Sequence, residues 1–177
     1  MSGSGNIIWQ QTYVRLSTGT TTDSVAQVEK AAYGFGTGEA YGATWSKKRY
    51  LGMYVYFLDT SALEAWLVAG SCEANYYEHI GFKLIDNKLY GTVADGSTES
   101  TLLLETISCS HKRLECIFDP TIPECRFYVD GEDKGAITTN LPTGTLRAIY
   151  LLNAKIRNTE AANKRMDISE WRCFQEE

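Results

Sequence analysis

The chain has 177 residues and a formal net charge of −5, with 44% hydrophobic and 22% charged residues. This length predicts a single domain that buries about 70% of its unfolded surface, so folding needs neither a metal nor a disulfide. The apolar content excludes a disordered chain, and the acidic balance argues against a nucleic-acid binder. We expect one globular domain at residues 6–177, preceded by a short flexible lead at residues 1–5.

The first residues read Met-Ser-Gly-Ser-Gly and lack the basic start and apolar core of a signal peptide. No stretch approaches the roughly 20 apolar residues that cross a bilayer, so we expect no membrane insertion. The cysteines are odd in number and form no Cys-x-x-Cys motif, which favours apolar packing in a reducing compartment over disulfides or zinc. They stand at Cys72, Cys109, Cys116, Cys125 and Cys173.

Apolar residues recur with period two, the spacing of a strand with one buried face. In the first third of the chain this pattern predicts strands at 7–16, 28–35 and 49–59, with a Thr-rich loop at 17–23. The third strand is the clearest, because an apolar stripe alternates with tyrosines. The apolar stripe is Leu51, Met53, Val55 and Phe57, and the opposite face carries Tyr50, Tyr54 and Tyr56.

Residues 60–70 fit two patterns. Ser61 and Glu64 have the spacing of a capping box, which would begin a short helix. The alternative is a turn at 60–63 followed by a strand at 64–70. We favour the strand, because strands are expected on both sides of it.

The remaining chain reads as a series of hairpins. Asp86-Asn87, Asp95-Gly96 and Asp130-Gly131 are two-residue turn signals, and two prolines place residues 119–124 in a loop. The strands expected here are 78–85, 89–94, 99–107, 111–119, 124–129, 134–139, 146–156 and 165–174. About eleven or twelve short strands with little helix predict an all-β fold, a two-sheet antiparallel β-sandwich or jelly roll.

Three stretches of sequence resemble a known superfamily. They are residues 78–99, the strand at 114–120 followed by the Phe-Tyr-Val-Asp-Gly hairpin within 126–135, and the closing strand at 166–171. Together they resemble the concanavalin A-like lectin/glucanase domains, including the laminin-G-like jelly rolls, over residues 49–175. This resemblance implies the fold. Similar stand-alone domains occur in bacteriophage and other virus structural proteins, so the resemblance also implies a virion role.

Catalytic patterns are absent from the sequence. The glucanases of that superfamily carry a Glu-x-Asp-x-x-Glu strand, whose period-two spacing places carboxylates on one face. Here Asp167 and Glu170 differ by three, which on a regular strand places them on opposite faces. The only histidines are His79 and His111, and no Gly-x-Ser-x-Gly motif is present. We expect a protein that is not an enzyme and uses no cofactor.

Several aspartates lie in turns, where they are either turn-forming residues or oxygen ligands for calcium. We assign no metal ligands among them. They are Asp95, Asp119, Asp130 and Asp133.

Aromatic residues are the candidate site. Flat rings with a polar group stack on sugar faces, anchor protein interfaces and also fill cores, so three interpretations stay open: packing, a protein interface or a glycan site. The set comprises Trp45, Tyr50, Tyr54, Tyr56, Trp66, Tyr76 and Tyr77.

The combined features favour a non-catalytic structural, assembly or adhesion module. The expected setting is a virion surface, as a capsid decoration or fibre protein, or the cytoplasm, with protein partners or self-association. The alternative is a carbohydrate-binding module that uses a concave sheet lined by Tyr and Trp.

Overall fold

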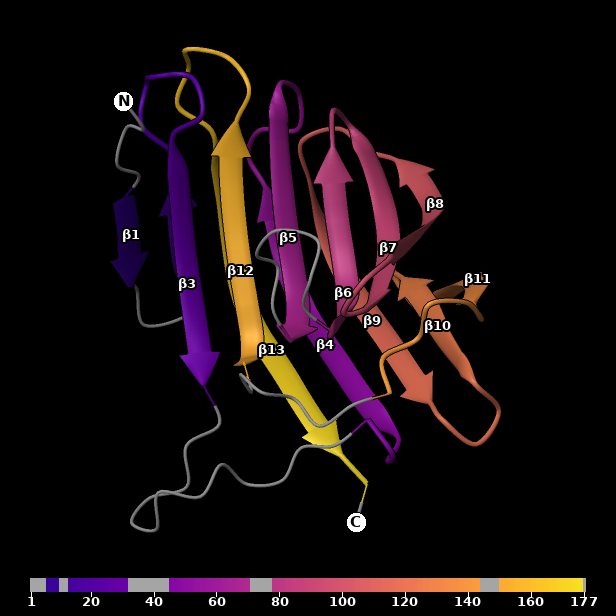
Figure 1. The fold of residues 1–177 in the computed structure, drawn as a ribbon. Helices are drawn as coiled ribbons and strands as arrows, with labels where there is room; N and C mark the ends of the chain where they lie inside the picture. Colours follow the sequence, from indigo (N-terminus) through magenta and orange to yellow (C-terminus); the bar gives the residue numbers. More distant parts are fainter. Residues whose placement is uncertain (1–5, 10–12, 32–44, 71–77, 144–149, 177) are drawn as a thin grey trace, which may run out of the picture.

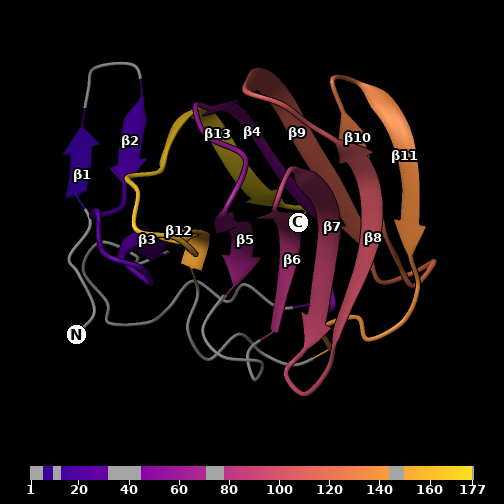
Figure 2. The same ribbon diagram turned by 90° about the horizontal axis from the view of Figure 1, so that it is seen from above.

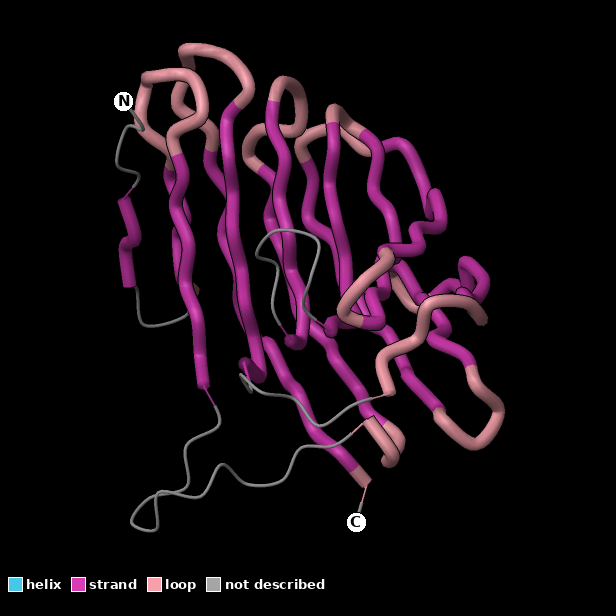
Figure 3. Tube along the Cα trace, in the orientation of Figure 1, coloured by secondary structure: helices cyan, strands magenta, loops and turns pink. Residues whose placement is uncertain are grey.

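The computed structural model describes residues 6–9, 13–31, 45–70, 78–143 and 150–176. Throughout these residues the chain forms strands, turns and loops (Figure 3), and no described helix is long and apolar enough to span a membrane. The strands are β1 (Asn6–Trp9), β2 (Val14–Ser17), β3 (Val25–Ala31), β4 (Arg49–Phe57), β5 (Leu63–Gly70), β6 (Glu78–Ile85), β7 (Lys88–Asp95), β8 (Glu99–Thr106), β9 (Ser110–Asp119), β10 (Glu124–Val129), β11 (Glu132–Ile137), β12 (Tyr150–Asn158) and β13 (Arg165–Gln175).

The strands form two antiparallel sheets packed face to face (Figures 1 and 2). The seven-stranded sheet has the order β1-β2-β13-β4-β9-β10-β11, and the six-stranded sheet has the order β3-β12-β5-β6-β7-β8. At one side of the sandwich β8 and β11 lie close together, as the view from above shows (Figure 2). The predicted all-β, two-sheet antiparallel sandwich is confirmed.

The expected hairpin turns have the required backbone geometry. At the turn between β6 and β7, Asp86 and Asn87 have φ of 43° and 67°, and at the turn between β10 and β11, Asp130 and Gly131 have φ of 54° and 84°. Positive φ at both central residues defines the type I′ turn, whose twist matches that of paired strands. These short connections account for the antiparallel pairing of β6 with β7 and of β10 with β11.

The core lies between the two sheets and follows the period-two pattern. Leu51 and Val55 of β4 are fully buried, and Leu67 of β5, from the opposite sheet, belongs to the same core cluster. Phe82 of β6 and Phe127 of β10 meet edge to face at 5.7 Å, which is a direct contact between the two sheets. Residues 63–70 form strand β5, so the favoured strand interpretation of this segment is confirmed.

The amino-terminal quarter differs from expectation. Residues 7–16, expected as one strand, include two short strands that pair as a hairpin with Trp9 opposite Val14. In the sequence, the polar residues Gln10, Gln11 and Thr12 interrupt the apolar pattern between the two strands, and the expectation of one strand passed over this signal. Strand β3 begins at Val25, three residues earlier than expected. Residues 1–5, 32–35 and 146–149 lie outside the described part of the chain.

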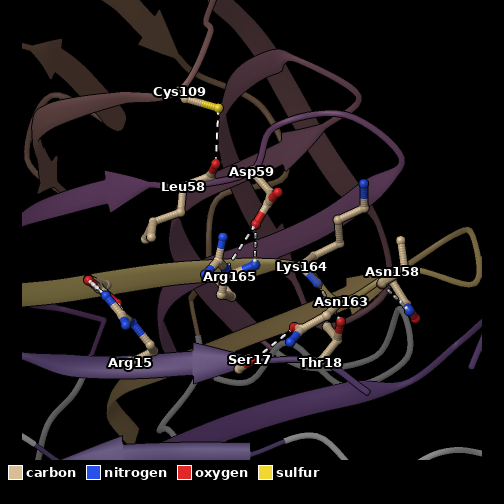
Figure 4. Close-up of polar contacts among 12 residues, drawn as sticks. Arg15, Ser17, Thr18, Leu58, Asp59, Cys109, Asn158, Asn163, Lys164 and Arg165 are labelled. Carbon is tan, nitrogen blue, oxygen red and sulfur yellow. Dashed lines mark hydrogen bonds and ion pairs between the residues drawn. The ribbon is translucent and has the colours of Figure 1, made fainter. Parts of the chain in front are cut away.

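Polar contacts tie together the loops at one end of the sandwich (Figure 4). The Ser17 hydroxyl donates to the Asn163 side chain at 2.8 Å, and the Arg165 amide donates to Asp59 at 2.9 Å. Arg15 forms two hydrogen bonds of 2.7 Å with Asp167 across the β2–β13 pair. A bidentate arginine–carboxylate pair of this kind fixes the register of β13.

Candidate functional site

The tyrosine row of β4, defined as Tyr50, Tyr54 and Tyr56, lies on the outer face of the seven-stranded sheet. Its neighbours in sequence are buried in the core, so the predicted division of this strand into two faces is confirmed. Tyr54 is the most open of the three, with 43% of its surface exposed. Strand β9 continues the row, because Arg113 pairs with Tyr54 in the strand register.

The two tryptophans of the candidate set, Trp45 and Trp66, do not lie beside the tyrosine row. Trp66 sits on β5, in the six-stranded sheet, with the ammonium groups of Lys83 and Lys155 at 5.4 and 5.6 Å from its ring centre. The outer faces of the two sheets point away from each other, so Trp66 does not share a surface with the tyrosine row. The expectation of a single Tyr/Trp-lined sheet is therefore wrong for Trp66.

Trp45 is a core residue rather than part of an aromatic surface. It is 1% exposed, packs edge to face on Phe118 at 5.5 Å, and lies 4.5 Å from the Arg49 guanidinium. The turn between Trp45 and β4 interrupts the period-two pattern, so the sequence could not show which way this ring faces. Tyr76 and Tyr77 lie outside the described residues, and their part in a site stays a prediction.

A hollow lies in the middle of the seven-stranded sheet, beside the tyrosine row. We call it the β4 hollow. Its volume is about 140 Å³, well above the ~10–15 Å³ that a single water requires. Its lining comes from β4, β9 and β13, the three central strands: Tyr50, Gly52, Met53, Tyr54, Arg113, Glu115, Glu170 and Arg172.

Gly52 shapes the floor of the β4 hollow. A Cβ atom at this position would stand 2.8 Å from ring carbons of Tyr50, closer than real side chains approach. The Tyr50 ring therefore leans across Gly52, and its other side stacks on Phe174 at 4.7 Å. Only glycine lets the tyrosine ring lie flat against the strand here.

Tyr50, Glu115 and Arg113 form a fixed polar triangle. The Tyr50 hydroxyl donates to Glu115 Oε1 at 2.5 Å, and Arg113 Nη2 donates to the same oxygen at 2.7 Å. Burial, followed by the contact with the Glu115 carboxylate, raises the pKa of Tyr50 to about 12. The hydrogen bond to Glu115 also raises the pKa of Arg113, so at neutral pH Arg113 keeps its charge and Tyr50 keeps its proton.

Glu170 and Arg172 form the opposite wall, and sequence reasoning missed both. The register of β13 against β4 shifts between Ser169 and Arg172, which marks a β-bulge. The extra residue leaves Trp171 packed against the core and Glu170 exposed. The expectation that Asp167 and Glu170 face opposite sides is therefore wrong, since it assumed a regular strand.

Both histidines contact neighbouring side chains, His79 through a hydrogen bond and His111 through ring stacking. His79 is buried, with Nε2 3.1 Å from the Thr92 hydroxyl, which in turn donates to Glu99 at 2.9 Å. Lys83 donates to the other Glu99 oxygen at 2.8 Å. His111 stacks on Tyr56 at 4.1 Å on the other sheet. His79 and His111 thus lie on different sheets and do not meet in one site.

The turn aspartates make local contacts. Asp95 accepts hydrogen bonds from both Ser97 and Thr98, and Asp119 accepts from Thr121. Asp133 accepts the Gly135 amide within its own hairpin, whereas Asp130 accepts the Arg113 amide of the neighbouring strand β9. Among the residues that the structure describes, no group of three His, Cys, Asp or Glu side chains is arranged to hold a metal ion.

Several solved structures have a similar two-sheet fold. The chain has the concanavalin A-like lectin/glucanase fold, as its solved structural neighbours show. No family model and no curated protein matches the sequence. Bacillus licheniformis β-glucanase is similar with a TM-score of 0.63 and 12% identity, over 97% of this chain and 83% of that one.

Two toxin binding domains are also similar. The binding domain of Paraclostridial Mosquitocidal Protein 1 aligns with a TM-score of 0.60 and 11% identity, over 99% of this chain and 43% of that one. The binding domain of botulinum neurotoxin DC in complex with SialylT has a TM-score of 0.63 and 11% identity, over 96% of this chain and 41% of that one. The chain thus spans less than half of these domains, and such low identities establish the fold alone.

Proposed function

We propose that this domain binds carbohydrate at the β4 hollow and along the adjoining tyrosine row. The observation that carries the proposal is the composition of the hollow. An exposed tyrosine, Tyr54, stands beside the charged side chains of Glu170 and Arg172. Neither charged group has a hydrogen bond or ion pair with another described residue.

Sugar chemistry matches this arrangement. A pyranose ring presents apolar C–H faces edged by hydroxyl groups, so it is bound by a flat ring together with donors and acceptors at the side. Tyr54 supplies the ring, while Arg172 donates and Glu170 accepts. The structural neighbours support the proposal, because one is called a β-glucanase and another is described as bound to SialylT.

Binding without hydrolysis is the form of the proposal that we favour. Glycoside hydrolysis uses one carboxyl group that gives up a proton and a second carboxylate. Glu115 is already engaged, because it accepts hydrogen bonds from both Tyr50 and Arg113. A reducing-sugar assay on any bound glycan tests this point, since release of sugar ends would show an enzyme instead.

Protein docking is the second candidate. Phe174, at the rim of the tyrosine row, is 57% exposed although it is a large apolar side chain. Exposed aromatic residues of this kind anchor protein interfaces. A structural or assembly role, including one on a virion, would use this same surface, and it stays a prediction from the sequence.

A glycan array tests the first candidate against the second. The array should carry neutral glucan, mannan and galactan oligosaccharides together with sialylated ones. Binding that Tyr54→Ala weakens supports the carbohydrate proposal. An empty array combined with a stable oligomer in light scattering, dissociated by Phe174→Ser, would replace it with the docking interpretation.

A further inference from the structure

Glu170 has an unusual backbone conformation for a residue in a strand. Its φ is +48°, within β13, and the other positive-φ strand residues of the described chain are glycines. Side chains with a Cβ atom adopt this left-handed conformation at a cost in free energy. The β-bulge therefore holds Glu170 in a conformation that the residue does not favour by itself.

The remaining positive-φ residues have a local explanation. Most are Asp or Asn in turns, the residue types that tolerate this conformation. Ala62 is the exception, at φ +50° in the turn before β5. Ala62 lines no part of the hollow, whereas Glu170 does.

We propose that Glu170 and Arg172 are the specificity-determining pair of the β4 hollow and that they read two adjacent hydroxyl groups of a neutral sugar. This inference rests on the proposed carbohydrate binding and adds to it the residues and the class of sugar. A carboxylate only accepts hydrogen bonds and a guanidinium only donates them. Neighbouring sugar hydroxyls satisfy both, one donating to Glu170 and the other accepting from Arg172.

The charges around the hollow favour a neutral ligand. Arg113 and Arg172 balance Glu115 and Glu170, so the formal charges of the lining cancel. Arg113 is already paired with Glu115. A sugar carboxylate would therefore meet one uncommitted arginine next to an uncommitted carboxylate, and like charges repel it.

The strained backbone at Glu170 is consistent with a role in sugar recognition. A β-bulge redirects a side chain out of the regular alternation of a strand, and strained residues persist where function needs their position. Here the bulge turns Glu170 to the surface, toward the hollow. Replacing Glu170 with glycine would relieve the strain but remove the acceptor.

Four proteins test the inference: wild type, Glu170→Gly, Glu170→Gln and Ala62→Gly. Each is measured for thermal unfolding and for binding to laminarihexaose, mannohexaose and 3′-sialyllactose, and on the same array as above. Ala62→Gly is the matched backbone control, because the Ala62 carbonyl that accepts from Thr159 is kept.

We expect both glycine variants to unfold at a higher temperature than wild type. Glu170→Gly should bind the strongest neutral glycan about tenfold more weakly, and Glu170→Gln about threefold more weakly, since charge-assisted hydrogen bonds are roughly twice as strong as neutral ones. Ala62→Gly should bind like wild type.

The two proposals fail in different ways. If wild type binds a neutral glycan and both Glu170 variants bind it equally well, the Glu170–Arg172 pair does not determine specificity. The proposed carbohydrate binding is then kept. Preference of wild type for 3′-sialyllactose over the neutral glycans also overturns the inference alone. Wild type that binds nothing on the array overturns the proposed function and the inference together.

Discussion

The Tyr50 hydroxyl reaches the Glu115 carboxylate at 2.5 Å by lying across Gly52, the residue that pairs with Glu115 in the strand register. One glycine thus allows a side chain of β4 to bond a side chain of β9 while remaining flat on the sheet. The floor of the β4 hollow depends on this contact.

Tyr50→Phe should lower the free energy of unfolding by about 1 kcal/mol at neutral pH, because it removes one hydrogen bond but keeps the ring stack on Phe174. The folded-state pKa of Tyr50 is raised from 10.0 to about 12. The stabilisation linked to this shift is fully present below pH 10 and is lost as the pH rises through 12. Urea unfolding of both proteins at neutral and alkaline pH checks this, and a difference that persists unchanged to high pH would contradict it.

Tyr54→Ala should weaken glycan binding about tenfold, since it removes the exposed ring. Its effect on stability should be about 1 kcal/mol or less, because the side chain is 43% exposed. Tyr90→Ala is the control, as Tyr90 lies on β7 in the six-stranded sheet. Calorimetric titration with the glycan that binds most strongly on the array measures the affinity of both variants. Equal losses in the two variants would mean that the tyrosine row is not the binding surface.

Gly52→Ala should keep the fold but disturb the hollow. The clashing atoms belong to the ring end of Tyr50, which can rotate away, so the contact with Glu115 breaks and binding is lost. Gly91→Ala provides the contrast: its Cβ would stand 2.7 Å from the Phe127 ring, which is fully buried. Overpacking a core in this way costs about 1–3 kcal/mol. The temperature of thermal unfolding should therefore fall far more for Gly91→Ala than for Gly52→Ala.

Glu99→Gln should reveal an acid-sensitive contribution to stability. Burial by itself raises the pKa of Glu99, but the hydrogen bond and charge of Lys83, with smaller help from Thr92 and His79, bring it below its ordinary 4.5. The resulting stabilisation is present above pH 4.5 and is lost as the pH falls through the lowered pKa. Melting curves from neutral pH to pH 3 should show the wild type approaching the variant only at the acid end. A difference in melting temperature between the two proteins that stays constant over this pH range would refute the prediction.

The thiols should differ in reactivity. Cys109 is exposed, with its sulfur 3.0 Å from the Leu58 carbonyl (Figure 4), whereas Cys116 and Cys125 are buried. Burial raises the pKa of Cys173 to about 11, and only the thiolate reacts. In a Cys72→Ser background, alkylation at mildly alkaline pH followed by peptide mass spectrometry should find Cys109 modified first. Early labelling of Cys116 would contradict the packing.

Period-two alternation was sufficient to predict most of the sandwich. It located β4 with its buried and tyrosine faces, and the turn signal at Asp130-Gly131 located the β10–β11 hairpin. The pattern failed where alternation is interrupted. The polar Gln-Gln-Thr at residues 10–12 separates β1 from β2, and Trp45 precedes its strand across a turn.

The candidate site was predicted only in part, for the same physical reason. Tyr50, Tyr54 and Tyr56 follow from alternation along one strand. Glu115 comes into the hollow through the register of β9, and Glu170 through a bulge. Pairing between distant strands and a one-residue insertion leave no mark on local periodicity. The odd spacing of Asp167 and Glu170 was visible, but a regular strand was the simpler interpretation.

The central position of the β4 hollow has a kinetic consequence. Its floor strand is hydrogen-bonded to β13 on one side and β9 on the other, and each of those strands has a further partner. A surface held this firmly is complete before a ligand arrives, so binding needs no slow rearrangement. Substitutions around the hollow should leave the association rate constant nearly unchanged and shorten the lifetime of the complex instead.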